Sequence, residues 1–278
     1  MTAPPIPTPT TARAAVLALA LLAAACSHSP PRPADIAPWD GVPPAEVLLL
    51  GEQHDAPDHQ RLQREAVAAL ASRGRLAALV MEMAEAGRST SRLPRDASET
   101  DVREALAWND AAWPWANYGP VAMEAVRAGV PVLGGNLPRA QMRETMRDTA
   151  WDARVPPAVL RQQIAAMEEG HCGLLPASQW PGMARIQIAR DARLAQAAAG
   201  ARRPGQTVLL VAGAGHVRRD LGIPLHWDDG LRAKVVIAQA RQEGQPLPAA
   251  AADRIVQTPA VPPKDHCADL RQRSSHAR

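Results

Sequence analysis

Two acids, two histidines and one amide are the side chains of this sequence best placed to do chemistry. Glu52, His54, Glu82, Asn136 and His216 each lie just after a short apolar run. Glu52 and His54 are two positions apart, so an extended chain points both side chains to the same side. A carboxylate beside an imidazole can hold a divalent metal or act as acid and base. Glu82 lies in an apolar setting where an unpaired charge is costly, so we expect it to have a partner.

Each of these residues also has an ordinary structural interpretation. A strand-end glutamate can cap backbone amides, and a strand-end histidine can be held by one hydrogen bond. The second histidine, His216 after the glycine turn 213–215, favours a shared site over separate coincidences. Glycines 213 and 215 begin the dinucleotide-binding pattern G-x-G-x-x-G, but Arg218 stands where its last glycine should be. The patterns H-E-x-x-H and G-x-S-x-G are also absent. Nucleotide binding and the common zincin and serine-hydrolase classes are therefore disfavoured.

The apolar runs predict the strands of a parallel sheet, since helical patterns alternate with them. The runs are residues 47–50, 76–81, 130–133, 207–212 and 234–238, and the helical patterns cover 57–72, 119–128 and 183–199. The carboxyl edge of such a sheet is where ligands bind in open α/β folds. A mostly helical tract, about 138–200, separates two strands. We therefore expect an α/β fold with a parallel sheet flanked by helices and a smaller, all-helical cap domain.

The N-terminus resembles an export signal. Arg13 precedes the apolar residues 14–25, which are too few to span a bilayer, and Cys26 follows a lipobox-like stretch. We predict a signal peptide at 1–25, a lipidated Cys26 and a flexible tether at 26–44, rich in proline and serine. Ser27 after the cysteine favours the outer membrane, facing the periplasm. The alternative is an ordinary secretory signal with a chance cysteine.

Beyond the tether, we expect an α/β domain at 45–240 and a tail rich in proline and alanine at 241–278. Net charge is only +3, with 31 basic residues interspersed among 28 acids, so we expect no nucleic-acid partner. In an exported protein Cys172 and Cys267 form an even pair and are a disulfide candidate, with two free thiols as the alternative. Thioredoxin-like and cysteine-based zinc chemistry are disfavoured because the sequence has no C-x-x-C.

The aromatic residues are few and clustered. Trp108, Trp113 and Trp115 lie close to Tyr118, the only tyrosine, in a chain that has no phenylalanine. A phenol flanked by indoles suits a flat, apolar ligand with one polar anchor, and a phenolate can be an axial ligand of haem iron. The alternative, which composition alone favours slightly, is that the indoles fill the core and Tyr118 caps a turn before Pro120.

Several of these motifs, in order, resemble the ChaN-like haem-binding lipoproteins. The matching residues are 49–55 with His59, 118–120, 135–139, 171–172, 183–187 with 190–191, and 213–216. The resemblance implies a lipoprotein of haem or iron uptake, handing its ligand to or from an outer-membrane haem receptor. It also implies a homodimer that encloses two stacked haems, with each iron held by a tyrosine and the propionates contacted from the partner. Tyr118 matches the position of the iron ligand.

The sequence departs from the family in its lysines, which the family uses near the propionates. Lysine occurs only at positions 234 and 264. Arg139 or His59 would have to serve instead, with Asn136 as a further cofactor contact. Arginine suits this role because its planar fork pairs well with carboxylates.

The wider superfamily, which includes metal-dependent proteases and erythromycin esterase-like hydrolases, implies an alternative. In that alternative Glu52, His54, Glu82 and His216 surround a divalent metal or activate water for hydrolysis. A third interpretation is a lipid-anchored interaction module without ligand chemistry. We expect a haem-binding protein rather than an enzyme.

Overall fold

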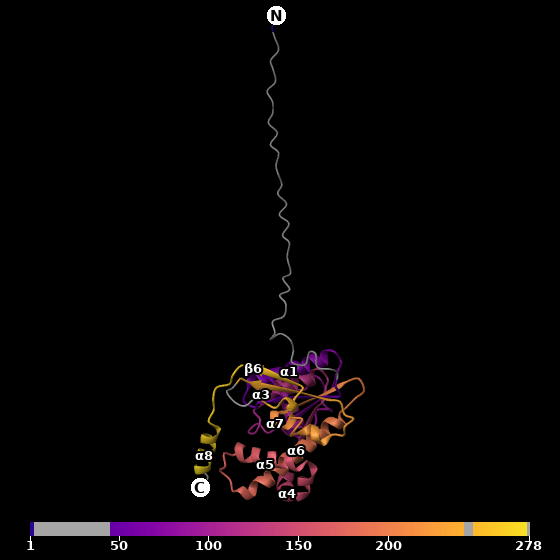
Figure 1. Cartoon of the computed structure of the whole chain (residues 1–278). Coiled ribbons are helices and arrows are strands. Elements are labelled where there is room, and N and C mark those ends of the chain that lie inside the picture. The colour runs from indigo at the N-terminus through magenta and orange to yellow at the C-terminus, as the bar shows by residue number, and fades with distance from the viewer. Residues whose placement is uncertain (3–44, 242–246, 277–278) are drawn as a thin grey trace. The chain divides into compact units, whose positions relative to one another are not determined.

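Six parallel strands form a single sheet in the order β3-β2-β4-β1-β5-β6 (Figure 1). The computed structural model describes residues 1–2, 45–241 and 247–276. The strands are β1 (Val47–Glu52), β2 (Leu76–Glu85), β3 (Val132–Asn136), β4 (Thr207–Gly213), β5 (Ala233–Ala240) and β6 (Arg254–Thr258). The sequence therefore predicts the fold class correctly, because short β-branched and leucine-rich runs that alternate with helices are typical of a parallel sheet.

Helices cover both faces of the sheet, which explains why the central strands β1, β2 and β4 are apolar along most of their length. Leu48 and Leu50 of β1 pack on the face covered by α1 (Pro57–Ser72) and α3 (Trp115–Arg127). Val47 and Leu49 point to the opposite face, which α6 (Trp180–Gly200) covers. A strand with one solvated face would alternate between apolar and polar residues. A short helix, α2 (Glu99–Ala105), precedes α3 and packs against it.

The tract between β3 and β4 is mostly helical, as the sequence predicts. It consists of η1 (Arg139–Gln141), α4 (Met142–Arg147), η2 (Thr149–Arg154), α5 (Pro157–Gly170), η3 (Ala177–Gln179) and α6. Figure 1 shows α4 and α5 gathered beside α6, and both pack against it. A small core of Val155, Val159, Ile188 and Leu221 holds this part together. Because α6 belongs to the cap and also covers the sheet, it joins the two.

The C-terminal part is more ordered than the expected tail at 241–278. After η5 (Ala249–Ala251), strand β6 pairs in parallel with β5 and extends the sheet, and helix α8 (His266–His276) follows. A disulfide joins Cys172, just after α5, to Cys267 of α8. The composition predicts a tail rich in proline and alanine, but the pairing of β6 depends on the sheet edge that β5 offers, which composition does not reveal.

The predicted signal peptide, the lipidated Cys26 and the tether lie outside the described residues, apart from residues 1 and 2. Among the residues that are described, no helix has both the length and the apolar character needed to cross a membrane.

Candidate functional site at the carboxyl edge of the sheet

The Glu52 carboxylate, at the end of β1, accepts four hydrogen bonds. Its Oε1 accepts from the Tyr118 hydroxyl at 2.7 Å and pairs with His54 Nδ1 at 2.6 Å. Its Oε2 accepts from Nε2 of Gln60 and of Gln63, both at 2.6 Å. Glu52 is buried, and this number of donors satisfies a charge that would otherwise be expensive to bury. Helix α1 supplies both glutamines because Gln60 and Gln63 are three positions apart and so share one face.

His54 is the part of this network that faces outward, since its side chain is 44% exposed while that of Glu52 is inaccessible. The carboxylate of Glu52 holds Nδ1 and so fixes the ring, while Nε2 has no hydrogen bond within the described chain and lies beside Gly213. Trp113 packs edge-on against the ring, with centroids 4.9 Å apart. Burial lowers the pKa of His54, but the hydrogen bond to Glu52 and the charge of Glu82 outweigh it and raise the pKa above its usual value.

Tyr118 lies inside α3 rather than at a turn, and it is 1% exposed. Trp113 packs edge-on to its ring with centroids 5.8 Å apart, and Trp108 lies at 6.3 Å. Burial, with the nearby Glu52 carboxylate, raises the pKa of the phenol far above its usual value. The aromatic cluster therefore belongs to the core on the α1 and α3 face, and its phenol supports Glu52 in this structure.

A second network joins Glu82 of β2, His216 of α7 (Ala214–Val217) and Asp191 of α6. Asp191 Oδ1 lies 2.6 Å from His216 Nδ1, and Glu82 Oε1 lies 3.5 Å from His216 Nε2. Glu82 Oε2 also accepts the Gly213 backbone N–H at 2.8 Å. Glu82 thus has the partner that its apolar setting required. The arrangement is an acid–histidine–acid series, almost wholly buried.

The pKa values in this series follow from burial opposed by mutual attraction. Burial lowers the pKa of His216, but Glu82 and Asp191 together raise it to about 10. Burial raises the pKa of Glu82, but His216 outweighs it and brings the pKa to about 2. Burial raises the pKa of Asp191 to about 6 in spite of His216. Near pH 7 the series therefore holds a cation between two anions.

Gly213 lies where the two networks meet. A Cβ atom at this position would fall 2.9 Å from His54 Nε2 and 3.6 Å from Glu82 Oε2. Only glycine leaves room for the imidazole to approach the buried carboxylate so closely. The register of the sheet produces this meeting, since Glu52 of β1 pairs with Gly213 of β4.

The remaining predicted contacts lie in different settings. Asn136 is buried and donates from Nδ2 to the Glu82 carbonyl, while its Oδ1 has no partner among the described residues. Arg139 is exposed, and within the described chain its guanidinium has no hydrogen bond or ion pair. His59 is buried, with Nδ1 accepting from the Gln53 backbone and Nε2 paired to Thr258 Oγ1 at 2.8 Å. His59 therefore fastens α1 to β6 and is not open to a ligand here.

Three residues that complete the networks are not among the predicted site residues: Gln60, Gln63 and Asp191, although Asp191 lies in one of the motifs that match the family. Asp191 carried a signal, because it is an acid in the alanine-rich face of a helix, where burial requires a partner. No group of three or more His, Cys, Asp or Glu side chains is placed to hold a metal ion in the part of the chain that the structure describes. The histidines and carboxylates of the two networks can exchange protons, and the exposed imidazole of His54 can contact a ligand. The site is therefore suited to acid–base chemistry or to ligand binding.

Fold and site together define an α/β protein whose parallel sheet ends in buried acid–histidine networks beneath a helical cap. The model of the family described as haem-binding uptake, Tiki superfamily, ChaN matches residues 39–226, so this chain belongs to that family. Among solved structures it is similar to ChaN of Campylobacter jejuni, which binds cofacial heme. The two share 21% identity with a TM-score of 0.64, over 76% of this chain and 86% of that chain. No curated protein matches this chain.

Proposed function

We propose that this protein binds haem and serves haem or iron uptake in the bacterial cell envelope. The observation that carries the proposal is the family match over residues 39–226, which includes both the sheet edge and the cap. The similarity to a ChaN protein with cofacial haem supports it. The polar sheet edge is the region of this fold where a ligand is expected to bind.

Tyr118 is the iron ligand that the family resemblance implies, and the structure sets a condition on that role. Its hydroxyl is buried and donates to Glu52, so it must exchange the carboxylate for iron. His54 is the rival donor, since Glu52 holds its Nδ1, its Nε2 has no hydrogen bond within the described chain and its side chain is 44% exposed. A histidine whose other nitrogen is bound by a carboxylate is a common arrangement of metal ligands.

Arg139 is the residue at this edge that fits a haem propionate. Its exposed guanidinium is unpaired within the described chain, and a planar fork binds carboxylates well. Lys234 is paired with Asp253 and Lys264 with Asp269, so neither replaces it. His59 would first have to leave Thr258, while Asn136 offers an unpartnered Oδ1 as an acceptor.

The family resemblance also suggests where the protein is located and how it assembles. We propose lipidation at Cys26, anchoring in the outer membrane facing the periplasm, and a homodimer that encloses haem and exchanges it with an outer-membrane receptor. A Cys26→Ser variant should lose incorporation of labelled palmitate and move from the membrane to the soluble fraction of the envelope. Membrane association that is unchanged in Cys26→Ser would remove the lipoprotein part of the proposal.

The decisive experiment is a ferric-haem titration of residues 27–278, followed by absorbance and light scattering. We expect saturation at one haem per chain, a high-spin tyrosinate-like spectrum and a mass that shifts toward twice the monomer value. Tyr118→Phe, which keeps the ring, should remove the tyrosinate band while His54→Ala retains it. Loss of the band in His54→Ala and its retention in Tyr118→Phe would instead identify His54 as the iron ligand. Absence of saturable binding by the unmodified chain would refute the haem proposal itself.

Hydrolysis is the second candidate, and the exposed His54 imidazole favours it. A histidine oriented by a carboxylate can take a proton from water, and Glu82 and His216 lie behind it. A divalent metal would have to be bound with additional ligands. His54→Ala should abolish hydrolysis of a simple activated ester if this function is real. Equal rates for His54→Ala and the unmodified chain, with and without chelator, would exclude it.

A further inference from the structure

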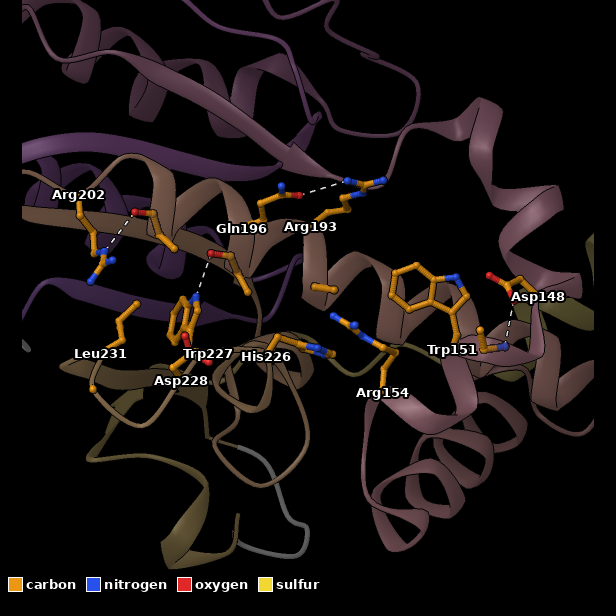
Figure 2. A pocket seen from close by; sticks show the side chains of 15 residues that line it. Asp148, Trp151, Arg154, Arg193, Gln196, Arg202, His226, Trp227, Asp228 and Leu231 are labelled. Carbon is orange, nitrogen blue, oxygen red and sulfur yellow. Dashed lines mark hydrogen bonds between the residues drawn. The ribbon is translucent and has the colours of Figure 1, made fainter.

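A groove of about 750 Å³ lies along α6, and none of the side chains of the sheet-edge networks lines it (Figure 2). The second half of α6, the 3₁₀ helix η2 and the segment after η4 (Ile223–His226) form it. Its volume is within the range of roughly 300–1,000 Å³ that is usual for small-molecule sites. Tyr118 packs in the core on the other face of the sheet, so the groove and the proposed iron ligand are separate.

Small residues on one face of α6 make the floor of the groove. Ala192, Ala195 and Ala199 lie three, four and seven positions apart, the spacing of one helix face, and all of them line the groove. Trp151 and Trp227 line it as well, and Figure 2 shows their indoles on either side of His226. Trp227 is fixed because its Nε1 donates to the Ala195 carbonyl at 2.9 Å. Two indoles beside an alanine floor suit a flat, apolar ligand.

Three side chains of the groove, those of Arg154, Arg193 and His226, have nitrogen atoms without a partner, which a ligand could supply. Arg154 is exposed and has neither a hydrogen bond nor an ion pair within the described chain, and its side chain points toward His226 in Figure 2. Arg193 Nε and His226 Nε2 are buried without a hydrogen-bond partner among the described residues. Buried polar atoms without partners are rare in native proteins and call for an explanation.

The unpaired cation of the lining favours an anion. Arg154, Arg193 and Arg202 line the groove together with Asp148 and Asp228, and Arg154 is the arginine without a partner within the described chain. Arg202 pairs with Glu46, so Arg154 is the guanidinium best placed to bind a carboxylate. Burial, with the charge of Arg154, lowers the pKa of His226 to about 4, so the ring adds no further charge at neutral pH.

We propose that this groove is a second ligand site, for a planar aromatic carboxylate whose ring lies against Trp151 and Trp227 and whose carboxylate pairs with Arg154. The site goes beyond the proposed haem function and does not depend on it. A porphyrin propionate and the carboxylate of a smaller aromatic acid share this chemistry.

Calorimetric titration with two probes distinguishes these sources: 2-naphthoate and metal-free protoporphyrin IX. The neutral methyl ester of 2-naphthoate isolates the contribution of charge. Arg154→Glu reverses the unpaired cation, and Gln196→Trp fills the groove from an exposed lining position. Arg143→Glu is the matched control, because it makes the same charge change at an exposed arginine on α4, outside the groove.

We expect the unmodified chain and Arg143→Glu to bind at least one probe alike. Arg154→Glu and Gln196→Trp should bind it at least about tenfold more weakly, and the methyl ester should bind weakly to all. Binding of naphthoate alone would identify a small aromatic acid, and binding of protoporphyrin alone a tetrapyrrole. Equal binding by Arg154→Glu and Arg143→Glu, or no binding of either probe, would overturn the proposal. Tyr118→Phe should leave this binding intact, so failure here is separable from failure of haem binding.

Discussion

The sheet-edge networks and the groove on α6 differ in whether their charged side chains have partners. At the sheet edge, three buried carboxylates, of Glu52, Glu82 and Asp191, each have partners within 3.5 Å. In the groove, Arg154 is unpaired and His226 Nε2 has no hydrogen-bond partner within the described chain. Side chains that are hydrogen-bonded to one another form a preorganised site in which few atoms are free to bind a ligand. Side-chain nitrogens without a partner, such as those in the groove, are free to bind one.

This difference indicates which atoms of each region can bind a ligand without the loss of an internal hydrogen bond. At the sheet edge, His54 Nε2, Asn136 Oδ1 and Gln63 Oε1 have no hydrogen-bond partner within the described chain. Any ligand that binds deeper must displace an internal hydrogen bond, as iron would at Tyr118. In the groove, a ligand can bind without breaking an internal contact. Mutations should therefore affect stability at the sheet edge and binding in the groove.

The largest effect should come from Glu52→Ala. This change leaves the Tyr118 hydroxyl, His54 and two glutamines without their acceptor in a buried setting. We expect a loss of about 3–5 kcal/mol in the free energy of unfolding, the usual cost of removing one partner of a buried charged group. Urea denaturation at pH 7 measures it. A loss below about 1 kcal/mol would mean that the network contributes little to stability.

His216→Gln should remove a stabilisation that depends on pH. The folded pKa of His216, about 10, lies above its unfolded value of 6.5. Its contribution is therefore complete below pH 6.5 and is lost as the pH rises toward 10. We expect His216→Gln to cost about 3 kcal/mol at pH 7 and little near pH 10. Denaturation curves at both pH values provide the check, and a cost independent of pH would contradict the assigned charge.

Gly213→Ala should act on the position of His54. The added methyl would lie 2.9 Å from His54 Nε2, so the ring must move away from Glu82. We expect a destabilisation of about 1–2 kcal/mol, as for other overpacking changes, and a His54 pKa closer to its ordinary value. Titration of the imidazole by NMR measures the pKa. An unchanged pKa would show that the ring does not depend on the space at Gly213.

Arg154→Glu should have the smallest effect on stability. The side chain is exposed and unpaired within the described chain, and such substitutions usually change the free energy of unfolding by less than about 0.5 kcal/mol. Thermal denaturation beside Arg143→Glu gives a direct comparison. A large loss would show that Arg154 supports the cap, and the contrast between the two regions would then be weaker.

Much of this architecture could be predicted from residue patterns. The predicted strand and helix runs are confirmed in type, with α1 matching in both bounds, because central parallel strands buried on both faces are mostly apolar. Glu52, His54, Glu82 and His216 could be assigned to one edge because parallel strands end together. Strand β6 could not be predicted, since its sequence, Arg254–Thr258, has no continuous apolar run and depends on the edge of β5.

The sequence by itself determined the order of elements, the family and the acids and histidines at the sheet edge, because these follow from local periodicity and motif spacing. Tertiary structure alone decided how those residues pair. Asp191 meets His216, and Tyr118 meets Glu52, across separations of 25 and 66 residues. It also decided that His59 joins α1 to β6, and that α6 lines a groove with its alanines. Such contacts depend on the packing of whole helices against the sheet, which no local pattern encodes.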